Sequence, residues 1–232
     1  MQACLPAACA ATLLLAGCAG THAVGYSLDP LGGEPVKIRT PVMVREIADR
    51  RPPDERFEPA EAKDFVFYSS DKVFTEPVAV SVTRMLQLEL ANSGVEVADQ
   101  GNHLIGSKPH IRVYGDLLHF QVTCKEVPID TLQYKVKTLW RRQQYSVRVS
   151  LHLHMVDGLT GKTVMSRVYN SSDSAPLRSE MIDVKAVQEE GVPLDKARWQ
   201  VAGENSCVEL LNDHLKRVLV EARNTIVKQL TP

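Results

Sequence analysis

The chain has 232 residues, with 27 Lys or Arg against 28 Asp or Glu, so its formal net charge is −1 at pH 7. This balance argues against a dedicated nucleic-acid-binding protein, whose domain would be clearly basic. Hydrophobic residues make up 44% of the chain, which is ordinary for a globular protein. No apolar run is long enough to span a bilayer as a helix.

The N-terminal segment is uncharged and apolar, and it ends in Leu15-Ala16-Gly17-Cys18. Its apolar run is shorter than the roughly 20 residues that a membrane-spanning helix needs, which is typical of an export signal. These four residues resemble the bacterial lipobox, in which the cysteine becomes the new N-terminus and carries a diacylglycerol on its sulfur. The segment departs from the usual signal because no Lys or Arg precedes the apolar run.

The lipobox resemblance implies that residues 1–17 are a signal peptide and that Cys18 is the lipidated residue. In that family an aspartate directly after the cysteine implies retention in the inner membrane, whereas Ala19 at this position implies the outer membrane. Two or more acyl chains are needed for stable anchoring. Residues 18–35 are rich in Gly and Pro and predict a flexible tether. We expect one α+β domain over residues 36–232.

The first part of the domain predicts one strand and a long excursion. Residues 36–44 alternate in polarity, and Pro41 indicates a strand near a sheet edge or a bulge. Residues 48–74 form a charged, proline-containing segment in which the apolar residues 65–68 predict a short strand.

A helix is predicted over about residues 76–93, with Gly94 as its stop signal. Its apolar residues recur at helical spacing and predict one buried stripe. Val80 and Leu88 lie off that stripe, so we expect the helix to be buried on more than one side.

After this helix, residues 95–97 are predicted to begin a short strand, and three longer strands follow. Residues 110–123 show a change of apolar phase near 115–118, which indicates a β-bulge. Residues 145–155 alternate regularly, which is typical of a strand with one buried face and one wet face. Gly158 and Gly161 are both able to take positive φ in the turn that leads to a strand at 163–170.

Residues 171–204 show little pattern and are expected to run over the surface. The chain ends in an amphipathic helix over about 206–229, for which Ser206 and Glu209 match a capping box. The predicted fold class is α+β, with a mixed, mostly antiparallel sheet of about 4–6 strands packed with two main helices.

The five cysteines have three expected fates. Cys4 and Cys9 leave with the signal peptide, and Cys18 is consumed by lipid. Cys124 and Cys207 remain, and an oxidising periplasm permits a disulfide between them. Two separate buried thiols are the alternative, because free cysteine is among the most buried residue types.

His152 and His154 share one face of the predicted strand at 145–155. A zinc site needs three or four ligands, and no third His or Cys accompanies them at a typical spacing. We therefore expect solvated histidines and no metal site. The sequence contains no phosphate-cradling glycine loop and no nucleophile elbow, which weakens the case for an enzyme. We also expect no cofactor.

A basic stretch with interleaved aromatic residues is the candidate binding region. Arginine beside aromatic side chains suits anionic head groups, phosphates or acidic sugars, and it is also common at protein interfaces. The alternative is a solvated basic edge strand that prevents edge-to-edge pairing. The candidate residues are Lys135, Lys137, Trp140, Arg141, Arg142 and Arg148.

The order of elements resembles that of the small α+β outer-membrane lipoproteins, namely the YajG-like proteins and the ABC-type transport auxiliary lipoproteins. The resemblance is carried by the lipobox, by Tyr26-Ser27-Leu28, by "LELANSGVEV", by "HIRVYGDLLHF" and by the turn "DGLTGK". It implies a periplasmic domain on the outer membrane that assists a lipid or ABC-type transport system without enzymatic activity.

The implied partners are the membrane itself, through the lipid, another envelope protein, and a lipid or anionic glycan. A structural or assembly lipoprotein that binds an envelope protein or peptidoglycan is the first alternative. An enzyme with a diffuse site is the second, and it would show a deep pocket with convergent titratable groups.

Overall fold

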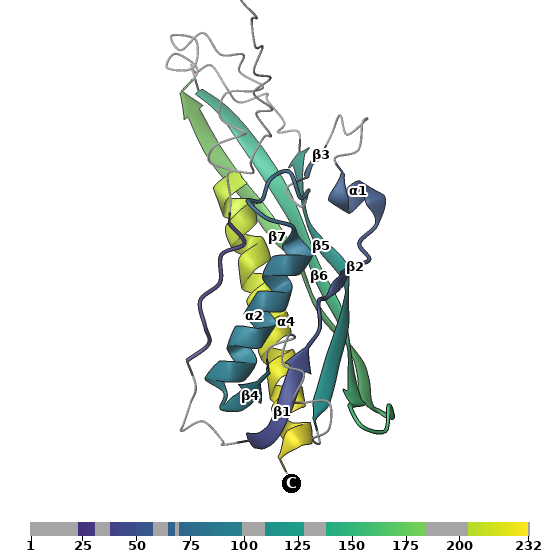
Figure 1. Cartoon of the computed structure of the whole chain (residues 1–232). Helices are drawn as coiled ribbons and strands as arrows, with labels where there is room; N and C mark the ends of the chain where they lie inside the picture. Colours follow the sequence, from purple (N-terminus) through teal and green to yellow (C-terminus); the bar gives the residue numbers. More distant parts are fainter. Residues whose placement is uncertain are drawn as a thin grey trace, which may run out of the picture.

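The computed structural model describes residues 23–30, 38–57, 65–67, 70–98, 110–127, 138–183 and 204–231. Within these residues the chain forms one mixed sheet of seven strands, with two long helices on one face (Figure 1). The strands are β1 (Ile38–Val44), β2 (Ala48–Asp49), β3 (Phe65–Phe67), β4 (Val95–Val97), β5 (Ile111–Val127), β6 (Thr138–Asp157) and β7 (Thr163–Asp183).

The main path of the sheet has the order β4-β1-β5-β6-β7. β5, β6 and β7 are antiparallel, whereas β1 is parallel to both β4 and β5. β2 and β3 pair with β5 further along the edge that β1 occupies. The predicted fold class is therefore confirmed, and the short strand expected at 65–68 is present as β3.

The two main helices are α2 (Val78–Asn92) and α4 (Glu204–Leu230), and a short helix α1 covers Pro53–Arg56. Both long helices agree with the predicted ranges within two residues at each end. α2 ends before Gly94, whose φ of 85° suits the left-handed residue that closes a helix. α4 begins two residues before Ser206, so the predicted capping box does not mark its start. Among the described helices, none combines the length and apolar character that crossing a bilayer requires.

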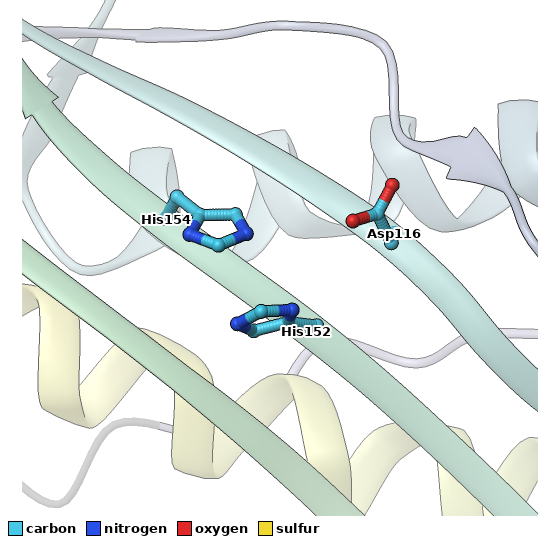
Figure 2. A group of neighbouring side chains, drawn as sticks. All are labelled: Asp116, His152 and His154. Atoms are coloured by element: carbon cyan, nitrogen blue, oxygen red, sulfur yellow. The ribbon is translucent and has the colours of Figure 1, made fainter.

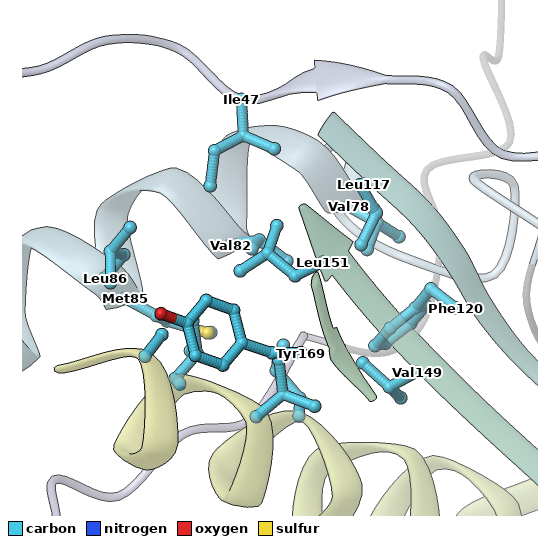
Figure 3. Close-up of a cluster of buried hydrophobic side chains, with 14 of the residues drawn as sticks. Ile47, Val78, Val82, Met85, Leu86, Leu117, Phe120, Val149, Leu151 and Tyr169 are labelled. Carbon is cyan, nitrogen blue, oxygen red and sulfur yellow. The ribbon is translucent and has the colours of Figure 1, made fainter. Parts of the chain in front are cut away.

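The core lies between the helices and the sheet, as Figure 3 shows for the part around Tyr169. The apolar stripes of both helices are buried there, against the inward residues of β5, β6 and β7. Val80 and Leu88 are 40% and 48% exposed, so the expectation that α2 is buried on more than one side is wrong. α4 and the sheet cover only the stripe side of α2, which leaves these two side chains in solvent.

The hairpin of β6 and β7 is the longest paired element of the described chain. Its predicted first half is confirmed, but β7 continues to Asp183 through a segment that was expected to run over the surface. Backbone pairing with β6 makes this a strand despite its weak side-chain pattern. The register slips between Tyr145↔Ala175 and Gln143↔Arg178, and Pro176 lies at this slip, where a missing N–H is tolerated.

The hairpin turn uses its two glycines differently. Gly161 has a φ of 71°, whereas Gly158 does not take a positive φ. A Cβ on Gly158 would lie 2.0 Å from Nε2 of His110, so this glycine is required by close approach and not by backbone conformation.

Candidate functional site

The sheet face opposite the helices carries the polar residues of β5, β6 and β7. Leu151, Leu153 and Met155 of β6 are fully buried toward the helices, and the residues between them, His152 and His154, lie half-buried on the opposite face. Because side chains alternate along a strand, this burial holds both histidines on the outer face.

The register between β5 and β6 brings a carboxylate beside the two histidines. Asp116 of β5 lies directly opposite His152 of β6. One potential ligand atom from each of Asp116, His152 and His154 lies within 4.8 Å of the other two. The two imidazole rings have centroids 4.0 Å apart and are tilted by 54°. Figure 2 shows the three side chains gathered on neighbouring strands. We call these three residues the Asp-His-His cluster.

Two further contacts bear on the chemistry of the cluster. Nε2 of His152 lies 3.0 Å from Oγ of Ser166 on β7. Nε of Arg50 lies 3.7 Å from Oδ1 of Asp116, and the Arg50 side chain is 71% exposed. An ion pair this exposed is worth little, so Arg50 balances the Asp116 charge without closing the cluster to other ligands.

The strand pattern of the sequence indicates the two histidines as neighbours but gives no sign of the carboxylate. Asp116 lies 36 residues before His152, and acidic residues at that distance carry no ligand-spacing signal. The bulge between Leu117 and His119, which was predicted and is confirmed, changes the outward phase of β5 just after Asp116. The cluster therefore depends on the pairing register of two strands, which the sequence alone does not specify.

A second polar cluster joins the N-terminal segment to both long helices. Residues 23–30 run beside α2 and α4, and Glu89 of α2 is fully buried where they meet. Oε1 of Glu89 accepts hydrogen bonds from the Tyr26 hydroxyl at 2.6 Å and from the Asp29 N–H at 2.9 Å. Oε2 accepts one from Nη1 of Arg223 at 2.8 Å, and Nη2 of Arg223 lies 3.1 Å from Oδ2 of Asp29.

The N-terminal segment is therefore docked where a flexible tether was expected. Val24 is 6% exposed and belongs to the core. Burial of the Tyr26 hydroxyl and its hydrogen bond to Glu89 raise the pKa of Tyr26 well above its ordinary value. The tether prediction for residues 18–35 is corrected for 23–30, because the Gly and Pro content of this stretch does not reveal that Glu89 and Arg223 hold it.

A buried histidine lies between β7 and α4. Nδ1 of His214 lies 2.7 Å from Oγ of Ser171, and His214 is 1% exposed. Burial lowers the pKa of His214, and the charge of Arg217 lowers it further, against the opposing charges of Asp173 and Asp213. A catalytic nucleophile and its base must reach a substrate, so this buried position favours a structural role for the pair.

The other predicted site residues are distributed along the sheet and α4. Cys207 is buried in the core at the start of α4. Cys124 lies in β5 opposite Tyr145, and its side chain is outside the described residues. The disulfide between Cys124 and Cys207 therefore stays a prediction, as does lipidation of Cys18, which also lies outside the described residues.

Residues 138–148 of the basic stretch lie in β6. Arg142 pairs with Val127 of β5 on one side and with Ser179 of β7 on the other, which contradicts the edge-strand alternative from Arg142 onward. Among the described residues, Trp140 and Arg141 pair with β7 alone. Arg148 is exposed on the outer face. The other candidate residues lie outside the described residues or have side chains that do. They are Lys135, Lys137, Trp140, Arg141 and Arg142.

No protein-family model and no curated protein matches the sequence. Solved structures that resemble this chain include protein XCC0632 of Xanthomonas campestris, of the DUF330 family, with a TM-score of 0.48 and 12% identity over 88% of this chain and 93% of that chain. A PelC dodecamer from Paraburkholderia phytofirmans has a TM-score of 0.34 and 10% identity, with 81% and 90% covered. A minor lipoprotein from Acinetobacter baumannii has a TM-score of 0.30 and 10% identity, with 82% and 91% covered.

At these identities and TM-scores, the likenesses carry no inference about what this chain binds. The predicted resemblance to YajG-like and transport auxiliary lipoproteins stays a prediction.

Proposed function

We propose that the protein is a lipid-anchored component of the bacterial cell envelope that assists a transport system by binding partners and without catalysing a reaction. The anchor is Cys18, the membrane is the outer membrane, and the domain lies in the periplasm. The observation that carries the proposal is the docking of residues 23–30 on α2 and α4, a segment that begins five residues after Cys18.

Docking of this segment limits how far the domain can lie from its anchor. Five residue steps separate Cys18 from Ala23, and an extended chain covers at most about 3.6 Å per residue. The anchored cysteine therefore lies within about 18 Å of the docked segment. A free tether over 18–35 would allow the domain to reach much further from the bilayer.

The docked segment also gives the domain a direction relative to the anchor. Gly25–Ser27 line a small surface pocket with Glu209, Asn212 and Lys216 of α4, and Asp29 contacts Arg223 further along the helix. The segment thus runs in the same direction as α4, and Ala23 lies toward the N-terminal end of that helix. β6 begins and β7 ends at this same end of the molecule (Figure 1).

This direction supports a role for the basic stretch in binding an anionic ligand near the membrane. Trp140, Arg141 and Arg142 lie in the first residues of β6, which is the end nearer the anchor. Basic residues near a membrane surface are attracted to anionic head groups, and Arg also binds phosphates in a bidentate geometry. A lipid head group or an anionic glycan is therefore the ligand class that we propose for this end.

Replacing Cys18 tests the anchor. Cells are labelled metabolically with an alkyne fatty acid, and labelling of the full-length chain is compared between wild type, Cys18→Ser and Cys9→Ser. We expect wild type and Cys9→Ser to be labelled equally and Cys18→Ser to lose the label, because only Cys18 follows the lipobox residues. Absence of label in wild type, or its retention in Cys18→Ser, contradicts the anchor.

Crosslinking in intact cells tests the binding role, with mass spectrometry of both proteins and lipids. We expect wild type to recover lipid or glycan, and Arg141→Glu with Arg142→Glu to lose most of it because the charge is reversed. A matched control is Arg84→Glu on α2, an exposed arginine outside the basic stretch. A stable protein partner without lipid favours the structural or assembly alternative, and recovery of neither contradicts both.

A further inference from the structure

We infer that the Asp-His-His cluster is a binding site for a divalent first-row transition-metal ion, held by two imidazole nitrogens and one carboxylate oxygen. This donor set suits Zn²⁺, Ni²⁺ or Cu²⁺. It does not suit Ca²⁺ or Mg²⁺, which prefer oxygen ligands throughout. The inference is independent of the lipid anchor.

The backbone preorganises the three side chains. His152 and His154 cannot turn inward, because their neighbours Leu151 and Leu153 are fully buried in the core. Asp116 is held opposite His152 by the β5–β6 register. Ligands supplied by paired strands are positioned more precisely than ligands on loops.

Bringing the three potential ligand atoms to the separations found around a bound metal requires only rotation of side-chain torsions. Ligand atoms around a tetrahedral zinc ion, with bonds of about 2.0–2.1 Å, lie about 3.3 Å from one another. The potential ligand atoms of the cluster all lie within 4.8 Å of one another without a metal. All three side chains are half-exposed, so rotation about χ1 and χ2 can close this gap without disturbing the core.

The surroundings of the cluster support coordination. Ligating histidines usually give their second ring nitrogen to a hydrogen-bond partner. Oγ of Ser166 occupies this position at 3.0 Å from Nε2 of His152, which leaves Nδ1 for the metal. Within the described residues, the ring nitrogens of His154 have no hydrogen-bond partner, so both are available. A bound cation also offsets the Asp116 charge that Arg50 balances only weakly.

Three protein ligands leave at least one coordination position open. A structural zinc site uses four protein ligands, whereas a site with three keeps a position for water or another donor. The fourth donor of this site is water or a group from whatever lies on the outer face of the sheet. The proposal is limited to binding and assigns no reaction to the metal.

The test measures metal binding directly. The full chain is purified in detergent, stripped with a chelator and titrated separately with Zn²⁺, Ni²⁺ and Cu²⁺ by calorimetry, with Co²⁺ absorption as a report of coordination geometry. We expect one equivalent to bind, and Ca²⁺ and Mg²⁺ not to compete. We expect at least about a tenfold loss of metal affinity in each of the variants His154→Ala, His152→Ala and Asp116→Asn. Mutation of residues that only hydrogen-bond to a metal ligand already lowers affinity by about this much.

A matched control distinguishes coordination from general charge effects. Glu96→Gln removes an exposed carboxylate on β4, outside the cluster, and is expected to leave the affinity unchanged. Thermal unfolding of each variant without metal checks that the domain is intact. Wild type that binds no Zn²⁺, Ni²⁺ or Cu²⁺ overturns the proposal. So does unchanged affinity in the His152→Ala, His154→Ala double variant.

Discussion

Replacing Glu89 by alanine is expected to lower the free energy of unfolding by about 3–5 kcal/mol, the usual cost of breaking a buried ion pair. Glu89 is fully buried and Arg223 is 5% exposed, so removal of the carboxylate leaves a buried guanidinium. Among the described residues, only the Asp29 carboxylate then balances its charge. The Tyr26 hydroxyl and the Asp29 N–H lose their acceptor as well. Denaturant unfolding followed by far-UV circular dichroism measures the loss.

An exposed ion pair provides the matched control. Nη2 of Arg167 lies 2.6 Å from Oε1 of Glu221, and the two side chains are 52% and 49% exposed. Glu221→Ala is expected to change stability by less than about 1 kcal/mol, because solvent screens such pairs. Limited proteolysis should cleave residues 23–30 faster in Glu89→Ala and at the wild-type rate in Glu221→Ala. An equal loss of unfolding free energy in Glu89→Ala and Glu221→Ala would contradict the larger stabilisation that we expect from the buried Glu89.

Phe120→Ala is expected to destabilise the domain by about 3–5 kcal/mol through lost burial and a new cavity. Phe120 is fully buried, and its ring packs edge-to-face on Phe74 with centroids 5.7 Å apart. Edge-to-face aromatic pairs contribute beyond their buried area. The Phe120 N–H donates to Oε2 of the buried Glu55 at 3.1 Å, so the backbone there cannot easily collapse into the cavity.

A pair of comparison variants separates cavity formation from a general loss of apolar side chains. Val168 lies on β7 opposite His152 and is 42% exposed. Val168→Ala is expected to change stability by no more than about 0.5 kcal/mol. Phe120→Leu should fall between the two, since it fills much of the space. A Phe120→Ala effect as small as that of Val168→Ala would contradict the packing in this part of the core.

Regular periodicity was sufficient to predict the central elements. In β6 the residues from Tyr145 to Met155 alternate without interruption, and each inward residue of that phase is buried. In α4 the apolar stripe was also identified correctly, because one face of a long helix must be buried. These elements carry their signal within a short window of sequence.

Backbone pairing produced the elements that periodicity missed. Residues 171–183 have no apolar alternation, yet they extend β7 because β6 offers unpaired backbone groups beside them. Conversely, Val80 and Leu88 are apolar but exposed, since a second covering layer over α2 is absent from the described chain. Local hydrophobicity does not tell whether a neighbouring element will cover a given face.

Order along the chain was enough to predict the two helices, the alternating strand and the phase change that became the bulge in β5. Contacts between distant residues were needed for the Asp-His-His cluster and for the docked segment 23–30. Asp116 meets His152 only through a strand register, and Glu89 meets Arg223 only where two helices pack. Side-chain period is a local property of the backbone, whereas the meeting of charged groups depends on how the elements pair in three dimensions.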